Sequence, residues 1–152
     1  MRIAAIALGA LSIAVACQPS AAHDHATGVV KERMEMMEAM AKRMKAIRER
    51  IDGKRDLAAI KTDAEAIASH APHIVHLFPP GSTQRPTDAR GTIWQSWPDF
   101  GRKATALEAE SRKLMNASAD DFDALSAQVR AVSLACAACH EKYRTKRRKG
   151  DE

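Results

Sequence analysis

Aromatic residues are scarce in this chain, since Phe, Trp and Tyr together make up only 4% of its 152 residues. A core of this size would be lean in flat apolar volume, which a bound planar group would supply, although Ala-rich and Met-rich helices can also pack without one. Strand signals are nearly absent too, because Ala, Met, Glu, Lys and Arg dominate and apolar residues recur at three- and four-residue spacing. These absences exclude a β-rich fold and favour an all-α one.

The chain also lacks an apolar run long enough to span a bilayer comfortably, because its longest run covers only residues 3–16. Arg2 before the run and small residues after it give the order typical of a secretory signal. We therefore expect cleavage after Ala22, which divides the chain into a signal peptide, 1–22, and an exported domain, 23–152, in the periplasm. In the alternative interpretation, Cys17 ends a lipoprotein box and carries a lipid, which is the one route to a membrane that the sequence offers.

Cysteine is rare and unevenly placed. Cleavage after Ala22 removes Cys17, so the exported domain keeps two of the three cysteines, both near its C-terminus. No structural disulfide is expected, although export implies an oxidising compartment. The sequence also shows no nucleophile–base pair, phosphate-binding loop or carboxylate pair with a partner, so we predict a protein that is not an enzyme.

Four stretches carry the apolar spacing of amphipathic helices, at 30–51, 57–74, 97–114 and 122–143. Gly53 stops the first stretch, Pro72 breaks or kinks the second, and a turn-rich loop at 78–86 separates the two halves of the chain. Ser96 and Ser118 are the expected caps of the third and fourth stretches. Four such helices with one long crossover loop predict an antiparallel four-helix bundle.

The two remaining cysteines belong to the sequence Cys136-Ala137-Ala138-Cys139-His140, the attachment signature of c-type haem. Two thiols can bond to the haem vinyl groups as thioethers, and the adjacent histidine can bind the iron. On a helix these three side chains project from one side, and both cysteines continue the apolar seam of the fourth stretch. The alternatives are a zinc site, which needs four ligands where the motif offers three, and two core cysteines beside a chance histidine. The registry with the seam favours one covalently attached haem c, with His140 as an iron ligand.

The residues from Cys136 to Arg144 resemble the C-x-x-C-H-x-x-[YF]-R motif near the C-terminus of the cytochrome c′ family. Residues 33–40 are similar to that family's first-helix pattern, R-x-x-x-[ML]-x-x-M, and residues 77–79 are similar to the loop after its second helix. The resemblance covers about residues 26–147 in the same order, and it is closest to the low-spin cytochrome c-556 branch. It implies a four-helix bundle with haem bound covalently to the C-terminal helix.

By this resemblance, Met37 faces the distal side of the haem, where a methionine binds the iron in the c-556 branch and closes the site to substrates. Met40, one turn further along the helix, is the alternative ligand. A methionine stripe that only fills the core is the alternative to any ligation. Met34 and Met36 lie off the apolar seam and are expected at the surface or flank.

Two arginines are candidate haem-binding residues. Arg33 lies on an otherwise apolar stripe, and a buried unpaired cation is costly. It should therefore have an anionic partner, for which a haem propionate is the expected choice, with an ordinary salt bridge or a snorkelling side chain as the alternatives. The resemblance places Arg144, four residues after His140, beside the proximal imidazole.

These features predict a monohaem c-type cytochrome that carries single electrons through a low-spin iron held by His140 and Met37. One alternative is a high-spin cytochrome c′ that binds or buffers small gases, NO and CO, at an open distal site. Another is a haem-free periplasmic copper-handling helical protein that uses the methionine stripe and the histidines. His70, His73 and His76 have the spacing of a shared helix face, but Pro72 is expected to disturb it.

The net charge is +5, and basic residues gather in the C-terminal tail at 142–149. The tail is either a solvated helix end, where cations suit the helix dipole, or a docking patch for an acidic redox partner. Redox proteins are the expected partners, nucleic acid is excluded by export, and a homodimer through the first two helices is common for this fold.

Overall fold

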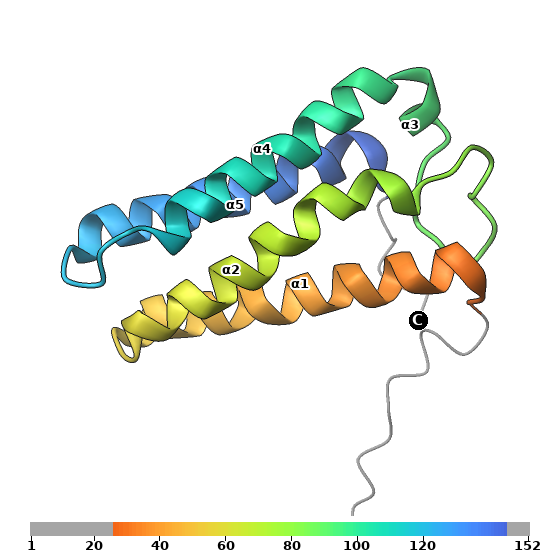
Figure 1. Cartoon of the computed structure of the whole chain (residues 1–152). Helices are drawn as coiled ribbons and strands as arrows, with labels where there is room; N and C mark the ends of the chain where they lie inside the picture. Colours follow the sequence, from red (N-terminus) through yellow and green to blue (C-terminus); the bar gives the residue numbers. More distant parts are fainter. Residues whose placement is uncertain (1–25, 146–152) are drawn as a thin grey trace, which may run out of the picture.

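A computed structural model describes residues 26–145 of the chain. The expected signal peptide, the Cys17 lipid site and the tail residues from Lys146 onward lie outside the described residues. Four long helices form an antiparallel bundle (Figure 1): α1 (Gly28–Gly53), α2 (Ile60–His70), α4 (Trp97–Met115) and α5 (Phe122–Tyr143). Shorter helical segments connect them: η2 (Leu57–Ala59), η3 (Ala71–Leu77) and α3 (Thr92–Gln95). The prediction of an all-α four-helix bundle is confirmed.

The bundle consists of two hairpins, α1 with α2 and α4 with α5, which lie side by side (Figure 1). The short turns of both hairpins lie at one end of the molecule, and the long connection from η3 to α4 lies at the other. Packing is closest between α2 and α4, whereas α1 and α5 make few direct contacts. This arrangement leaves room between α1 and the α4–α5 hairpin.

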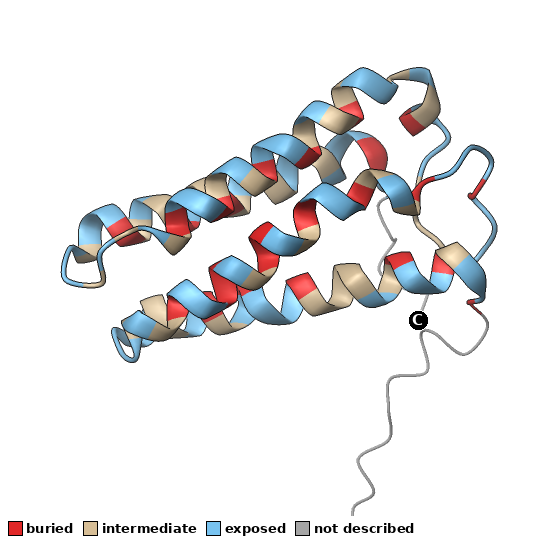
Figure 2. Ribbon diagram, viewed as in Figure 1, coloured by how far each residue is buried: buried red, intermediate tan, exposed pale blue. Residues whose placement is uncertain are grey.

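Apolar side chains on the inward faces of all four long helices join the hairpins through a single core (Figure 2). Burying each large side chain contributes about 1.5–3 kcal/mol. The largest fully buried apolar residues are Phe100, Ile47, Ile60, Ile67, Ile93, Leu114, Leu125 and Val132. All of these except Ile93 lie in the stretches that sequence periodicity predicted, whereas Trp97, at the start of the third stretch, is exposed.

The first helix ends at Gly53, as expected, whereas the two expected caps differ in detail. At the end of α1, Lys54 rather than Gly53 adopts the left-handed conformation, with φ 45°, and its N–H donates to the carbonyls of Arg50 and Ile51. At the start of α5, Asp121 replaces Ser118 as the cap, because its carboxylate accepts from the N–H of Ala124. Ser96 is the residue before α4, but its side chain makes no capping bond.

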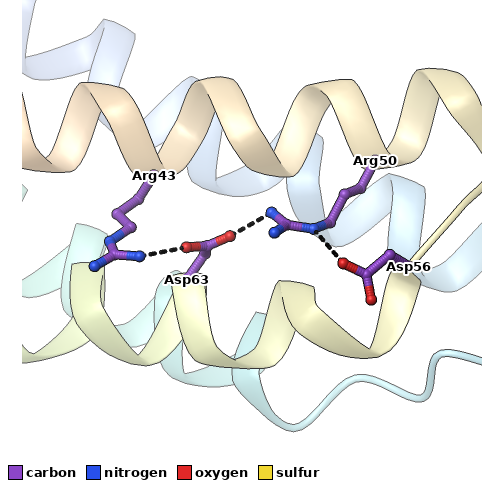
Figure 3. Close-up of polar contacts among 4 residues, drawn as sticks. All are labelled: Arg43, Arg50, Asp56 and Asp63. Carbon is purple, nitrogen blue, oxygen red and sulfur yellow. Dashed lines mark hydrogen bonds and ion pairs between the residues drawn. The ribbon is translucent and has the colours of Figure 1, made fainter.

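A charged cluster joins the two helices of the first hairpin (Figure 3). Asp63 on α2 is only 4% exposed and accepts from Arg43, at 3.0 Å, and from Arg50, at 2.5 Å, both on α1. Arg50 also contacts Asp56 at 3.2 Å. A buried carboxylate with two guanidinium partners fixes the register of α1 against α2.

Pro72 ends the α-helical geometry of the second stretch, as expected. The chain does not leave the helical path there but tightens into η3, a 3₁₀ helix with proline in its first turn. Ile74 of η3 remains buried, so the segment stays packed on the core up to Phe78.

Candidate haem site

A cavity of about 460 Å³ lies between α1 and the α4–α5 hairpin. Its volume falls within the range of roughly 300–1,000 Å³ found for ligand and cofactor sites. Most of its wall is apolar, and residues of all four long helices contribute to it, among them Ile67 of α2, Phe100 and Leu107 of α4 and Ala135 of α5. Residues 86–89 of the long connection close one side. The cavity therefore suits a flat apolar group with polar edges.

The proximal wall of the cavity is the last part of α5. Cys136, Cys139 and His140 all line the cavity, as the helical spacing of the motif predicted. Both cysteines are half-buried and free, while His140 lines the cavity and keeps access to solvent. The two thiols and the imidazole are thus presented from one helix to one space, which fits the attachment of haem c.

The surroundings of the two thiols differ from those of a redox-active C-x-x-C. Burial raises the pKa of the Cys139 thiol to about 11, and burial also raises the pKa of Cys136. Redox-active cysteines have lowered pKa values, because the thiolate is the reactive form. The apolar surroundings of Cys136 and Cys139 therefore do not favour that chemistry.

The surroundings of His140 favour its neutral imidazole, the form that binds metals. Desolvation lowers its pKa, and the positive charge of Arg144 lowers it further. A neutral imidazole keeps a nitrogen lone pair free for coordination. Arg144 also lines the cavity, so the structure brings it to the side of His140 that the resemblance implied.

The distal wall is α1, and methionines dominate it. Met34, Met37, Met40 and Met44 all line the cavity. Met40 and Met44 are buried, whereas Met37 is partly buried. Met34 and Met36 are both half-buried, which fits their expected place at the flank, but Met34 also lines the cavity and Met36 packs against the core. A helix contributes residues over an arc wider than a strict seam, which explains the difference.

Arg33, the arginine on the apolar stripe, is buried at 3% exposure. Its five N–H groups make five hydrogen bonds, all to neutral oxygens: the carbonyls of Leu77 and Ser82 and the hydroxyls of Ser82 and Thr87. Its guanidinium also lies over the ring of Phe78, 4.0 Å from the centroid. The described partners are thus not the anion that the sequence suggested, and a propionate would have to displace one of these bonds.

Residues 78–91, which we call the strap loop, connect the distal wall to the end of α5. Arg33 holds the loop from the α1 side. On the other side, the N–H of Arg90 donates to the carbonyl of Tyr143 at 2.9 Å, and the N–H of Thr145 donates to the carbonyl of Asp88 at 2.8 Å. Ala89 forms a bridge with Arg144. The strap loop therefore ties α1 to the segment that follows His140, and the arginine on the apolar stripe was the sequence signal for it.

Asp99 in the first turn of α4 bonds to the residues of α5 that follow the C-x-x-C-H motif. Its carboxylate accepts from the hydroxyl of Tyr143 at 2.7 Å and from the ammonium of Lys142 at 2.9 Å. These bonds hold the pKa of Asp99 well below its usual range. Sequence reasoning missed this link, because it joins residues 44 positions apart.

Comparisons with known proteins agree with this geometry. The family model described as Cytochrome C′ matches residues 28–144. Cytochrome c-556 of Agrobacterium tumefaciens (strain II Chrys) is 30% identical over 122 residues, which cover 79% of this chain and 99% of that protein. A nitric oxide complex of a cytochrome c′ variant from Alcaligenes xylosoxidans has a TM-score of 0.69 and 32% identity, covering 78% of this chain and 94% of that one. A cytochrome c′ described for ligand-controlled dimer dissociation has a TM-score of 0.72 and 26% identity, covering 78% of this chain and 95% of that one.

The family match extends over nearly all of the described residues, from the first turn of α1 to the residue after α5. It includes the motif, both walls of the cavity and the strap loop. The alternative of a haem-free copper-handling protein is therefore wrong. The chain belongs to the cytochrome c′ family of monohaem c-type cytochromes and carries one covalently bound haem c.

Proposed function

We propose that this cytochrome is a single-electron carrier with a low-spin iron held by His140 of α5 and Met37 of α1. The observation that carries the proposal is the position of the two side chains, which line one cavity from helices that otherwise make few contacts. The relation to cytochrome c-556 over almost the whole of that protein supports the low-spin branch.

Each site residue then has a distinct task. Haem c supplies a one-electron couple when it is bound. Cys136 and Cys139 hold it as thioethers, His140 provides an imidazole ligand, and Met37 provides a thioether ligand that favours the ferrous state. The apolar wall excludes water from the distal side, so that these residues favour electron transfer over chemistry on a bound substrate.

The two arginines act at the edges of the site in this proposal. Arg144 places a positive charge beside His140. Its side chain is half exposed and pairs with Asp88 at 3.5 Å, so a propionate would share the guanidinium with that carboxylate or replace it. Arg33 acts by holding the strap loop. Its contact with a propionate stays a prediction, because all five N–H groups are already engaged.

Substitution of Met37 by Leu tests the proposal. Leu has a similar volume and no sulfur, so the apolar wall is kept while the ligand is removed. We expect the ferric protein to lose its methionine–iron charge-transfer band and the ferrous protein to gain rapid carbon monoxide binding. Optical spectra and stopped-flow mixing measure both effects. Met34→Leu, another cavity methionine, is the matched control and should leave both unchanged.

A charge-transfer band that persists in Met37→Leu and disappears in Met40→Leu would move the ligand one turn along α1. Rapid carbon monoxide binding by the unmodified protein, without that band, would favour the second candidate function, gas binding at an open distal site. The nitric oxide complex of the Alcaligenes xylosoxidans relative supports this second candidate function.

The cellular setting belongs to the same proposal. We infer export by cleavage after Ala22 into the periplasm, with redox proteins as partners and a membrane anchor only if Cys17 is lipidated. In residues 26–145, no helix is long and apolar enough to cross a membrane. A homodimer is also proposed, with support from the relative whose dimer dissociates under ligand control.

A further inference from the structure

The histidines of η3 lie closer together than the sequence indicated. His73 and His76 are both exposed, and their ring centroids are 6.5 Å apart. In a 3₁₀ helix, side chains at positions i and i+3 eclipse each other. The tightening of the chain at Pro72 therefore aligns these two rings, where an α-helical continuation would have offset them.

We propose that His73 and His76 form a surface site for a divalent transition-metal ion, with Cu(II) and Zn(II) as the ions that imidazole pairs suit. Nitrogen ligands lie about 2.0–2.1 Å from such an ion. The two exposed rings can rotate to bring one nitrogen each onto a common ion. Within residues 26–145, no group of three or more His, Cys, Asp or Glu side chains is placed to hold an ion, so water completes the coordination of the pair.

The site is separate from the haem cavity. His73 and His76 lie on the solvent side of η3, while Ile74 between them is buried and lines the cavity. An ion that joins the two imidazoles would brace η3 across one turn. Because the ion binds the folded segment, it should raise the temperature of unfolding by mass action. The site does not depend on which residue is the sixth ligand of the haem iron.

Calorimetric titration of the untagged haem-loaded protein with ZnCl₂ tests the site. Zn(II) is chosen because it is redox-inactive and leaves the haem oxidation state unchanged. We expect one binding event that weakens by at least about tenfold in His73→Gln/His76→Gln, since both nitrogen ligands are lost. His70→Gln, at the end of α2, is the matched control and should bind Zn(II) as the unmodified protein does.

Cu(II) titration followed by electron paramagnetic resonance gives a second measurement, in which the η3 site should show two equatorial nitrogen ligands that the double variant lacks. The haem absorption spectrum establishes that each variant keeps its fold. Equal Zn(II) affinity in the unmodified protein and the folded double variant would overturn the site. A loss caused by His70→Gln alone would overturn it as well.

Discussion

Arg33 is a buried cation that donates five hydrogen bonds to neutral oxygens. Desolvation lowers its pKa, and the cost of burial is offset by five hydrogen bonds to oxygens of Leu77, Ser82 and Thr87. Carbonyl and hydroxyl dipoles thus take the place of a counter-ion. The planar geometry of the guanidinium matters more than its charge, because its five donors bond to Leu77, Ser82 and Thr87 at the same time.

Arg33→Lys should therefore destabilise the protein although it keeps the charge, since an ammonium cannot reproduce the planar fork of donors. We expect a loss of about 1–3 kcal/mol in the free energy of unfolding, measured by urea denaturation of the haem-loaded protein. Arg48→Lys is the control, because Arg48 lines the same cavity from an exposed position. Equal midpoints for the two variants would show that the fork is not required.

Asp99 predicts a specific acid sensitivity. The hydroxyl of Tyr143 and the ammonium of Lys142 stabilise the carboxylate, so its pKa in the folded protein lies below the usual value of about 4. The Asp99 carboxylate therefore binds a proton more readily in the unfolded chain than in the folded one. Its contribution to the free energy of unfolding is present above a pH of about 4 and is lost as the pH falls below that value.

Asp99→Asn removes this titration. We expect the variant to be less stable than the unmodified protein at neutral pH, and the difference to shrink as the pH falls from about 4 toward 2. Thermal unfolding followed by circular dichroism across this range measures it. A difference that stays constant with pH would contradict the role given to the carboxylate charge.

Single residues could be predicted from the sequence when their chemistry is local. Cys136, Cys139 and His140 follow from one turn of helix, whereas the role of Met37 came from the resemblance to the family and stays a prediction. The partners of Arg33 could not be predicted, because they lie 44 to 54 residues away in a loop without regular spacing.

Among the helices, the start of α5 shows how a cap is chosen. Ser118 and Asp121 are both good capping residues, and they stand three positions apart. The hydroxyl of Ser118 accepts from the N–H of Asp120 in the preceding turn, whereas Asp121 accepts from Ala124 inside the helix. Asp121 also places its negative charge at the positive end of the helix dipole.

Asp121→Ala should cost about 0.5–2 kcal/mol of stability, the range measured for lost helix caps. Ser118→Ala, which removes a bond outside the helix, should change stability by less than about 0.5 kcal/mol. Denaturant unfolding of the two variants compares them directly. A larger loss of stability in Ser118→Ala than in Asp121→Ala would show that Ser118 is the cap.

The boundary between α2 and η3 shows which structural features a proline in the sequence can predict. Pro72 correctly marks the end of α-helical geometry. It could not indicate whether the chain would turn away or continue in a tighter helix. Burial of Ile74 and Phe78 decides this, because a 3₁₀ path keeps both residues on the core.

For the molecule as a whole, the charged cluster of Figure 3 contains both a buried and an exposed carboxylate, which should contribute differently to stability. The Asp63 side chain is only 6% exposed and joins two helices, whereas that of Asp56 is 65% exposed and contacts Arg50 alone. Asp63→Asn should lower stability by about 1–3 kcal/mol, as expected for a hydrogen bond to a charged group.

Asp56→Asn is the matched control and should cost about 0–1 kcal/mol, as for exposed ion pairs. Urea unfolding at low and high salt measures both, and the Asp56 effect should fade with salt while most of the Asp63 effect remains. Equal, salt-sensitive losses would show that burial of Asp63 does not strengthen its pairs.

Most of the architecture could be predicted because helical periodicity and the C-x-x-C-H motif are both local patterns. The four long helices, the break at Pro72 and the inward position of the thiols follow from them. What could not be predicted joins distant parts of the chain: Arg33 to the strap loop, Asp99 to Tyr143, and Met34 to the cavity wall. Such contacts depend on how the helices pack against one another, and the spacing of residues in the sequence does not determine that packing.

The strap loop has a consequence for the order in which the molecule forms. Contacts within each hairpin are close in sequence and form early, whereas the link from Arg33 to Ser82 closes 49 residues and the cavity itself needs the first and last helices together. On a growing chain, α5 is the last helix to be made. Because burial in the finished bundle raises the pKa of the Cys136 and Cys139 thiols, we expect the chain to be most receptive to covalent modification while its bundle is unfinished.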